Sequence, residues 1–278
     1  MLLAIDVGNT QTVLGVYDGK RLLHQWRIAT MKHHTSDELR VKLKPLFDSE
    51  GIVASCIDGA ALASVVPCLT DAWRAAIRHM IGVSAVVCSA ETAADLFEAD
   101  YPNPREIGAD RVADAVAARS RFGSPVVVVD FGTATNIEVI DVRGCFIGGV
   151  IAPGIETSAQ ALFSHATKLG AIDLVDPHAA IGRNTEQAMQ AGIVYGEVDR
   201  VDGLVRRIFR QLGYEAPVVA TGGLATRVAK ESGTITAIMP DLTLEGLRLV
   251  YEAQADSPAK SEKGALADCP LVSAGRNQ

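Results

Sequence analysis

The chain carries the same short acidic turn twice, each time between two stretches that have the pattern of β-strands. Residues 6–10 read Asp-Val-Gly-Asn-Thr, and residues 130–135 read Asp-Phe-Gly-Thr-Ala-Thr. Each copy follows an apolar run and precedes an alternating run that ends in a turn, which predicts a strand, a tight turn and a second strand. One such motif is typical of an ordinary hairpin. Two copies in matching contexts indicate a duplicated scaffold that binds phosphate.

The backbone of the motif suits an anion. Gly8 and Gly132 lack a Cβ, so the chain can turn sharply and approach a ligand closely. Successive N–H groups in such a turn form a concave site that favours anions. Hydroxyl donors are added by Thr10, Thr133 and Thr135.

The two aspartates of the motif need a different role, because a carboxylate repels phosphate. Asp6 and Asp130 can hold a cation, or the waters around one, and the cation can then meet the phosphates. Two such turns facing each other can hold a polyphosphate between them. The motifs therefore point to phosphoryl transfer.

Composition limits the class of protein. The 278 residues are 48% hydrophobic, which is enough for two cores or one duplicated core. The net charge of −7 gives no support to nucleic-acid binding. The five cysteines are scattered without a CxxC pair or zinc-like spacing, as in reduced thiols. Without a charged leader or a run of roughly 20 apolar residues, we expect a cytoplasmic protein with no membrane partner.

The segment pattern predicts two lobes of similar plan, at 1–122 and 123–253. Each lobe opens with three strands, expected at 2–6, 12–17, 22–29, 126–130, 135–141 and 145–151. Thr35 and Glu38 have the spacing of a capping box, and Thr70 is expected to cap the next helix. The longest helix is expected over 185–211, and a disordered tail over 254–278.

The segment Gly108-Ala109-Asp110-Arg111 places a carboxylate beside a guanidinium where a loop meets an expected helix. Asp110 can take or orient the proton of a substrate hydroxyl, as the base of a kinase does. Arg111 can hold a substrate carboxylate through two parallel hydrogen bonds. The alternative is a helix-capping Asp next to a surface Arg, and spacing alone favours that alternative.

A further turn, Thr221-Gly222-Gly223, follows a strand and precedes a helix. Its glycines let an adenine or ribose lie against the backbone, and a helix N-terminus favours phosphate. A plain strand-to-helix turn is the alternative. The chain has no G-x-S-x-G, no G-x-x-x-x-G-K-[ST] and no G-x-G-x-x-G after the first strand, which excludes the serine hydrolase, P-loop and dinucleotide-binding classes.

These features resemble the actin-like ATPase superfamily, which includes sugar kinases and acetate kinase. More narrowly, the chain resembles the type III pantothenate kinases over about residues 2–250. The segments that carry the resemblance are 6–10 (DVGNT), 101–104 (YPNP), 108–111 (GADR), 130–135 (DFGTAT), 148–154 (GGVIAPG) and 221–223 (TGG). The resemblance implies an α/β fold of the duplicated actin-like (ribonuclease H-like) type, with two mixed-sheet lobes flanked by helices and a cleft between them.

The resemblance also implies a reaction, in which ATP phosphorylates the primary hydroxyl of pantothenate to give 4′-phosphopantothenate, the first step of coenzyme A synthesis. Asp110 would be the general base. The pantothenate site would be lined by Tyr101, Gly108, Ala109, Asp110, Arg111 and Thr185. ATP would contact Asp6, Val7, Gly8, Asn9, Thr10, Gln11, Thr12, Val13 and Thr133.

The same resemblance implies cofactors and a partner. Asp130 would bind a monovalent cation, K⁺ or NH₄⁺. Mg²⁺ would accompany ATP, with Asp6 holding it through water. Members of the family are homodimers, and the long helix over 185–211 offers small residues for such a contact.

Three other functions stay open. Another kinase of the superfamily would act on a sugar or on a carboxylate such as acetate, and the segment 108–111 is the feature that argues against it. An accessory transcription factor, a label that some relatives have carried, is disfavoured by the acidic charge and by the lack of a helix-turn-helix pattern. An ATP-sensing module without an acceptor is the third.

Overall fold

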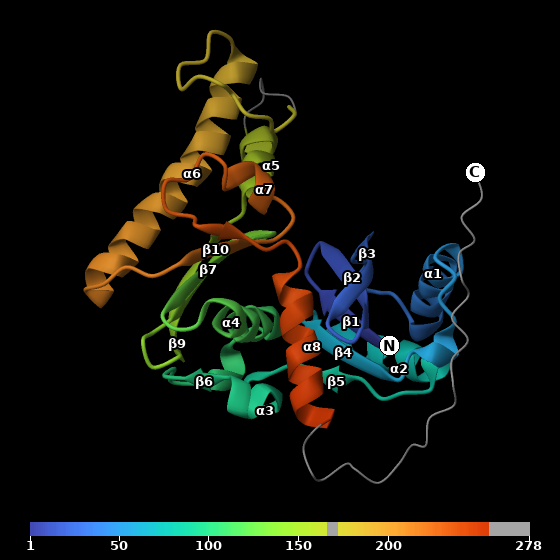
Figure 1. Ribbon diagram of the computed structural model, residues 1–278. Helices are drawn as coiled ribbons and strands as arrows, with labels where there is room; N and C mark the ends of the chain where they lie inside the picture. Colours follow the sequence, from blue (N-terminus) through green and yellow to red (C-terminus); the bar gives the residue numbers. More distant parts are fainter. Residues whose placement is uncertain (166–171, 256–278) are drawn as a thin grey trace, which may run out of the picture. The chain divides into compact units, whose positions relative to one another are not determined.

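The structure is a computed structural model that describes residues 1–165 and 172–255, and the chain divides into two compact units (Figure 1). Unit 1 contains residues 1–96, 108–110 and, in its described part, 247–255. Unit 2 contains residues 97–107 and 111–246. The lobes expected at 1–122 and 123–253 stay a prediction. The tail expected over 254–278 lies outside the described residues from 256 onward.

Unit 1 is built on a five-stranded mixed sheet in the order β3-β2-β1-β4-β5. β1 pairs antiparallel with β2 and parallel with β4, so it occupies the centre of the sheet. The strands are β1 (Leu2–Val7), β2 (Gln11–Asp18), β3 (Arg21–Ala29), β4 (Gly59–Ser64) and β5 (Val86–Val87).

Helices α1 (Ser36–Ser49) and α2 (Pro67–Ile81) pack on one face of this sheet, where alternate residues of β1 join their apolar side chains in a single core. Thr35 and Glu38 form the predicted capping box of α1. The prediction that Thr70 caps the next helix is wrong, because α2 begins at Pro67. Proline suits the first helical position, where a missing N–H leaves no bond unmade. Shorter helices of unit 1 are η1 (Ala54–Cys56), α3 (Ala90–Ala93) and η2 (Ala94–Leu96).

Unit 2 is built on a six-stranded mixed sheet in the order β11-β10-β7-β8-β9-β6. The strands are β6 (Glu98–Ala99), β7 (Val126–Phe131), β8 (Ala134–Ile140), β9 (Cys145–Pro153), β10 (Val218–Thr221) and β11 (Ala237–Ile238). The helices are η3 (Pro104–Glu106), α4 (Ala109–Phe122), α5 (Ile155–His165), α6 (Thr185–Leu212), α7 (Ala225–Val228) and α8 (Leu242–Ala255); α4 and α8 each begin in one unit and end in the other.

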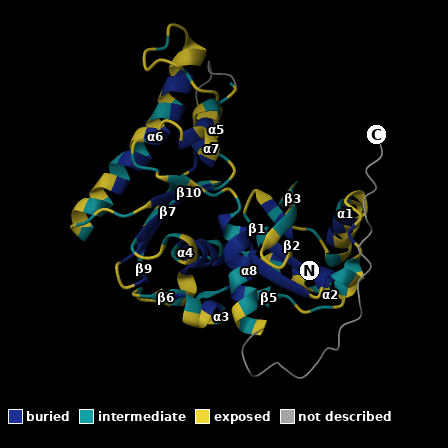
Figure 2. Cartoon of the chain, viewed as in Figure 1, coloured by how far each residue is buried: buried dark blue, intermediate teal, exposed yellow. Residues whose placement is uncertain are grey.

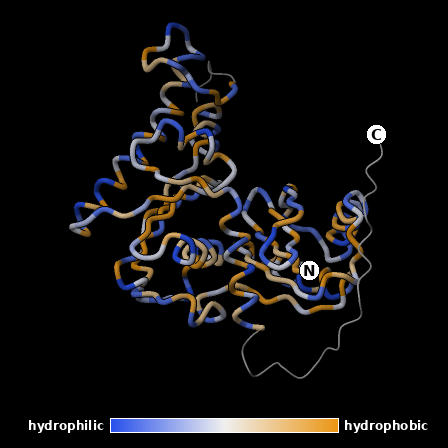
Figure 3. The backbone as a smooth tube through the Cα atoms, in the orientation of Figure 1, coloured by the Kyte–Doolittle hydropathy of each residue, from blue (hydrophilic) through white to orange (hydrophobic). Residues whose placement is uncertain are grey.

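Both faces of the central strand β7 are buried (Figure 2). Val127 and Val129 point to the side of α5, α6 and α7 and share a core with the valines of α6. Val126 and Val128 are equally buried but face the other side, where α4 lies in Figure 1. The continuous apolar colour of β7 and β10 in Figure 3 reflects this burial on two faces.

The two sheets share one plan. The order β3-β2-β1-β4-β5 matches β9-β8-β7-β10-β11 strand for strand, with the same parallel and antiparallel pairings, and β6 is an addition to the second sheet. Asp6 and Asp130 are each the fifth residue of a six-residue central strand with the same burial pattern. The predicted α/β fold with two mixed sheets flanked by helices is confirmed, whereas the cleft stays a prediction.

Two expectations about the rest of the chain can be compared with the structure. In the part that it describes, no helix combines the length and the apolar character needed to cross a membrane. Cys68, Cys88 and Cys145 carry free thiols.

Candidate active site

The first acidic turn, between β1 and β2, is closed by a short backbone hydrogen bond. The N–H of Gly8 donates to the carbonyl of Gln11 over 3.0 Å, and a Cβ at Gly8 would lie 2.8 Å from that oxygen. Asn9 and Thr10 are exposed, and the carbonyl of Thr10 accepts from the N–H of Thr30 over 2.9 Å. The turn is therefore tight, anchored and accessible.

The residues that flank this turn differ in exposure. Asp6 and Val13 pair across the two strands and are half-buried. Val7 and Thr12 are buried, and the Thr12 hydroxyl lies 2.8 Å from the hydroxyl of Thr30. Val7 and Thr12 can thus meet a ligand through their backbone rather than their side chains.

Asp110 belongs to unit 1, where Gly108 and Val65 connect it to the end of β1. The N–H of Val65 donates to the carbonyl of Val7, at the end of β1, over 3.1 Å. A Cβ at Gly108 would lie 3.7 Å from Cγ1 of Val65 and 2.4 Å from Oδ1 of Asp110. The Asp110 carboxylate therefore occupies the space that a side chain at Gly108 would fill, and Ala109, which is buried, begins α4 between them.

Asp130 is enclosed by two glycines of unit 2. Gly222 has φ +92°, and a Cβ there would lie 2.4 Å from Oδ1 of Asp130 and 2.6 Å from the carbonyl oxygen of Phe131. A Cβ at Gly132 would lie 3.6 Å from Oδ2. The parallel strands β7 and β10 pair Asp130 with Thr221, so their carboxyl ends meet at one edge of the sheet, where ligands of α/β proteins usually bind. The second acidic turn and the Gly-Gly turn thus converge on one carboxylate.

The turn after β7 is supported by the segment that ends β9. The N–H of Gly132 donates to the carbonyl of Ala134 over 3.0 Å. Thr133 is exposed, while its carbonyl accepts from the N–H of Gly154 over 3.0 Å and from the hydroxyl of Thr157 over 2.6 Å. A Cβ at Gly154 would lie 2.3 Å from the Gly132 carbonyl oxygen, so this backbone contact requires glycine.

Arg111 belongs to a mostly buried cluster of unit 2. Its Nε donates to Oε1 of Glu138 over 2.8 Å; the Glu138 side chain is fully buried and that of Arg111 is 12% exposed. The guanidinium carbon lies 5.3 Å from the centroid of the Phe146 ring, and Tyr101 packs edge-on against the same ring. The alternative of a surface Arg beside a capping Asp is therefore wrong.

Two glycines of β9 border this cluster, and Gly149 leaves the space that it needs. A Cβ at Gly149 would lie 1.7 Å from the carbonyl oxygen of Ile137 and 3.2 Å from Nη2 of Arg111. A Cβ at Gly148 would lie 3.7 Å from the ring of Tyr101. The cluster thus combines a rigid cation with an aromatic wall, which suits a small molecule that carries a carboxylate.

The expectation that Thr135 offers its hydroxyl to phosphate is wrong, because its side chain is buried. Oγ1 of Thr135 donates to Oε1 of Glu197, on α6, over 2.6 Å. Glu197 also accepts from Nη2 of Arg200, and the same Nη2 donates to the carbonyl of Pro153 over 2.6 Å. Thr135 therefore supports the second acidic turn and does not offer its hydroxyl to phosphate.

Sequence reasoning missed four residues of these clusters: Glu138, Phe146, Glu197 and Arg200. Glu138 is the one acidic residue of the strand 134–140. A charged residue in an otherwise buried strand almost always has a partner, and that rule was the available signal. The spacing of Glu197 and Arg200 marks a helical pair but does not say which face of α6 meets the sheet.

Thr185 is not joined to the acidic turns. It is the first residue of α6 and is exposed, one residue after the cap Asn184, whose side chain accepts from the N–H of Gln187 over 2.8 Å. From 185 to 197, where Glu197 reaches β8, the helix rises by about 18 Å. The chain therefore does not bring Thr185 to the second turn.

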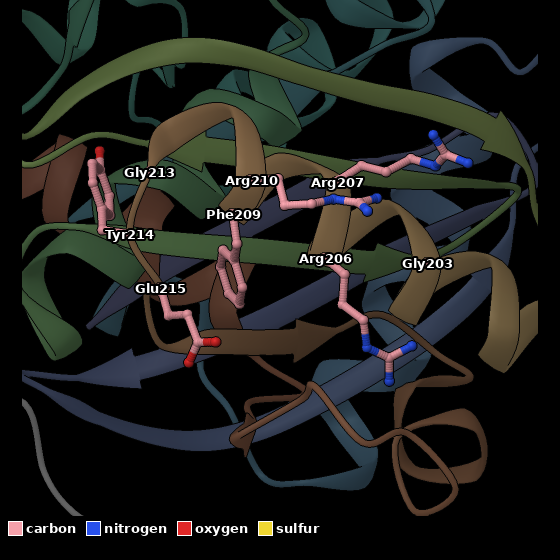
Figure 4. A pocket seen from close by; sticks show the side chains of 8 residues that line it. All are labelled: Gly203, Arg206, Arg207, Phe209, Arg210, Gly213, Tyr214 and Glu215. Carbon is pink, nitrogen blue, oxygen red and sulfur yellow. The ribbon is translucent and has the colours of Figure 1, made fainter.

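A separate pocket of about 640 Å³ lies at the C-terminal end of α6 (Figure 4). It is lined by Gly203, Arg206, Arg207, Phe209, Arg210, Gly213, Tyr214 and Glu215. None of the site residues expected from the sequence lines it. In residues 1–165 and 172–255 no group of three or more His, Cys, Asp or Glu could hold a metal ion.

Comparisons with known proteins point to one family. A family model described as type III pantothenate kinase matches residues 2–207. A type III pantothenate kinase of Roseiflexus castenholzii is 48% identical over 253 residues, which cover 91% of this chain and 98% of that protein. One of a Geobacillus species is 44% identical over 256 residues, with 92% and 99% covered.

Among solved structures, a Porphyromonas gingivalis protein assigned as an N-acetylglucosamine kinase is similar with a TM-score of 0.52. It is 14% identical, and the match covers 91% of this chain and 99% of that one. This likeness shows the fold alone, which is the actin-like fold of sugar kinases expected from the sequence.

Proposed function

This chain belongs to the type III pantothenate kinase family, and we propose that it transfers the γ-phosphate of ATP to the primary hydroxyl of pantothenate. The product is 4′-phosphopantothenate, and the reaction is the first step of coenzyme A synthesis. One observation carries the proposal: two acidic turns, each closed by a backbone hydrogen bond from the N–H of its glycine, follow equivalent strands of two sheets of one plan. The turns support the binding and transfer of phosphate, and membership of the family supports pantothenate as the acceptor.

ATP contacts residues 6–13 and Thr133. Gly8 allows close approach of the backbone, and the exposed Asn9, Thr10 and Thr133 offer polar groups to the phosphates. Backbone N–H groups in such turns bind anions without bringing a charge of their own. An acidic chain can bind an acidic nucleotide in this way.

Asp130 holds K⁺ or NH₄⁺, and Asp6 holds Mg²⁺ through water. The donor set fits these ions, because the Asp130 carboxylate and the Phe131 carbonyl both lie against the backbone of Gly222 and provide hard oxygen ligands. Mg²⁺ usually keeps several waters and takes one or two carboxylates plus substrate phosphates, which suits a single Asp6. When bound, these ions neutralise charge on the transferring phosphoryl group.

Asp110 is the general base. Its carboxylate accepts the proton of the pantothenate hydroxyl while the hydroxyl oxygen bonds to the γ-phosphorus and the bond to ADP breaks. Its place beside Val65, which binds the end of β1, supports this role because β1 leads directly into the first turn. The protein contributes mainly alignment and charge stabilisation.

Arg111 binds the pantothenate carboxylate, which needs a charged partner once it leaves water. Glu138 and Phe146 hold the guanidinium in one orientation, so its Nη edge presents a fixed fork that matches a carboxylate. Because Glu138 already compensates the charge, recognition depends on hydrogen-bond geometry more than on net attraction. The further residues proposed to contact pantothenate are Tyr101, Gly108 and Ala109.

The chain acts as a cytoplasmic homodimer in which Thr185 contacts pantothenate bound to the second subunit. This arrangement reconciles a substrate role for Thr185 with its distance of about 18 Å along α6 from Glu197. Sedimentation tests the dimer. Mixing the Thr185→Ala and Asp110→Asn variants tests the shared site, because exchange of subunits restores activity only if each site uses residues of both chains.

The test of the proposed function uses the purified full chain with ATP, Mg²⁺ and K⁺, with and without pantothenate. We expect ADP release that depends on pantothenate, together with a product heavier by one phosphoryl group in mass spectrometry. Absence of that product in the presence of ADP release would overturn the assignment.

The same assay separates the other functions. Transfer to a sugar or to acetate in a panel of acceptors would indicate a different kinase of the superfamily. ADP release without any acceptor would indicate an ATP-sensing module. A DNA shift that is sensitive to salt and occurs at low protein concentration would favour a transcription factor.

A further inference from the structure

We propose that Glu197 is a positioning residue that holds the second acidic turn, from α6, in the shape that binds ATP. This inference rests on the proposed function, which assigns Thr133 to ATP and Asp130 to a cation. Glu197 is 3% exposed, and its carboxylate accepts from Thr135, on one flank of the turn, and from Arg200, which donates to the end of β9 on the other.

The first flank is β8. Thr135 follows the Gly132–Thr133 turn almost directly, and its buried hydroxyl donates to Glu197 over 2.6 Å. A hydrogen bond to a buried charged group is worth more than a neutral one, and it fixes the side chain in one rotamer. This hydrogen bond therefore holds the start of β8, directly after the turn, against α6.

The second flank is the end of β9. Arg200 bridges Glu197 to the carbonyl of Pro153, and the next residue, Gly154, donates its N–H to Thr133. The carbonyl of Thr133 thus connects back to Glu197 through a short chain of hydrogen bonds. The Glu197 carboxylate thus fixes the position of β8, which follows the turn, and of the end of β9, which supports the turn.

The geometry also predicts which of the two substrates binds more weakly when the Glu197 contact is lost. Side chains alternate along β8, so Thr135 and Glu138 point to opposite faces of the sheet. Thr135 meets α6, whereas Glu138 holds Arg111 in the cluster assigned to pantothenate. Loss of the Glu197 contact should therefore weaken ATP binding and leave pantothenate binding nearly unchanged.

The same helix offers a matched control. Asp202 is a second buried carboxylate of α6; it accepts from Thr234 over 2.7 Å and from Arg206 over 3.0 Å. Like Glu197, it accepts from a hydroxyl and from an arginine of α6, and it also accepts from the Ser232 hydroxyl and the Gly233 N–H. Apart from Arg206, these partners belong to the loop before β11 and not to the acidic turn.

The experiment compares Thr135→Val, Thr135→Ser and Thr234→Val in the full chain. ATP affinity is measured by calorimetry without pantothenate, KM is measured for each substrate, and thermal unfolding is recorded. We expect Thr135→Val to weaken ATP about tenfold with less than about a twofold change in pantothenate KM, as for loss of one charge-assisted hydrogen bond. Thr135→Ser should keep the wild-type affinity for ATP, because it keeps the hydroxyl. Thr234→Val should lower the unfolding temperature without weakening ATP binding.

Unchanged ATP affinity in Thr135→Val, or an equal loss in Thr234→Val, overturns the inference. If Thr135→Val does not fold, Arg200→Gln is compared with Arg206→Gln by the same measurements, with ATP weakened only in the first. If the wild-type chain binds ATP but does not phosphorylate pantothenate, the proposed function is wrong. The ATP affinities of the variants still test the role of Glu197 in that case.

Discussion

The backbone of Gly222 lies against the carboxylate of Asp130, so closely that a Cβ at position 222 would come within 2.4 Å of Oδ1. Gly222 follows β10 and Asp130 is the second-last residue of β7, and the parallel pairing of these strands brings the two together. The contact joins the second acidic turn to the Gly-Gly turn, and it leaves no room for a side chain between them.

Gly222→Ala should therefore destabilise the protein by about 2–4 kcal/mol, from strain at φ +92° together with the clash on Asp130. Gly213→Ala is the control, because Gly213 has φ +79° but no atom within 4 Å of an added Cβ; strain alone should cost about 1 kcal/mol. Urea unfolding measures both. Equal losses in the two variants would contradict the packing argument.

Asp110→Asn should lower turnover at least about a hundredfold while leaving the unfolding temperature nearly unchanged, because the amide cannot accept the substrate proton. Asp71→Asn is the control, an exposed aspartate of α2 that pairs with Arg74 one turn away. Steady-state kinetics and thermal unfolding test both. Near-normal turnover of Asp110→Asn would remove this residue from the role of base.

Arg111→Lys should raise the KM for pantothenate at least about tenfold and leave the KM for ATP unchanged, since an ammonium cannot reproduce the fork that Glu138 and Phe146 orient. Arg119→Lys, on the same helix, removes an arginine that donates to the Gly144 carbonyl and should alter neither constant. A change confined to the KM for ATP would argue against a carboxylate site at Arg111.

Turnover should be faster in K⁺ or NH₄⁺ than in Na⁺, because Asp130 and the backbone beside it form a site of oxygen donors. Asp130→Asn should reduce this preference, since it removes the negative charge. Rates are compared in the three chloride salts at equal ionic strength. Identical rates of the wild-type chain in all three would count against a monovalent cation at Asp130.

Acid should destabilise unit 2 through Asp202. Burial raises the pKa of this carboxyl. Hydrogen bonds from Ser232, Thr234 and the Gly233 N–H, together with the charge of Arg206, lower the pKa by more than burial raises it, so it lies below the ordinary 3.8. The unfolded chain then binds more protons between the two pKa values. The stabilisation is complete above pH 3.8 and is lost as the pH falls through the lower, folded pKa.

The free energy of unfolding, measured in urea at a series of pH values, should accordingly fall with pH below about 4. Asp202→Asn should be less stable at neutral pH and should lose less stability on acidification, because the titrating group is gone. A parallel fall in wild type and variant would assign the acid sensitivity to other carboxylates.

The elements that local pattern determines were predicted from the sequence. The apolar and alternating runs around Asp6 and Asp130 encode both hairpins, and the spacing of Thr35 and Glu38 encodes the start of α1. The start of α2 at Pro67 was not predicted, because capping by Thr70 is an equally local alternative. The resemblance of short motifs to a known family supplied the fold and the reaction.

Only the tertiary structure decided which distant groups meet. Asp130 with Gly222, Arg111 with Glu138 and Thr135 with Glu197 are pairs from different elements. A buried polar group must find a partner, but hydrophobic periodicity does not say which one, since that depends on strand order and on the face that each helix presents. The same reason separates Thr185 from the acidic turns, because helix length, not sequence motif, sets that distance.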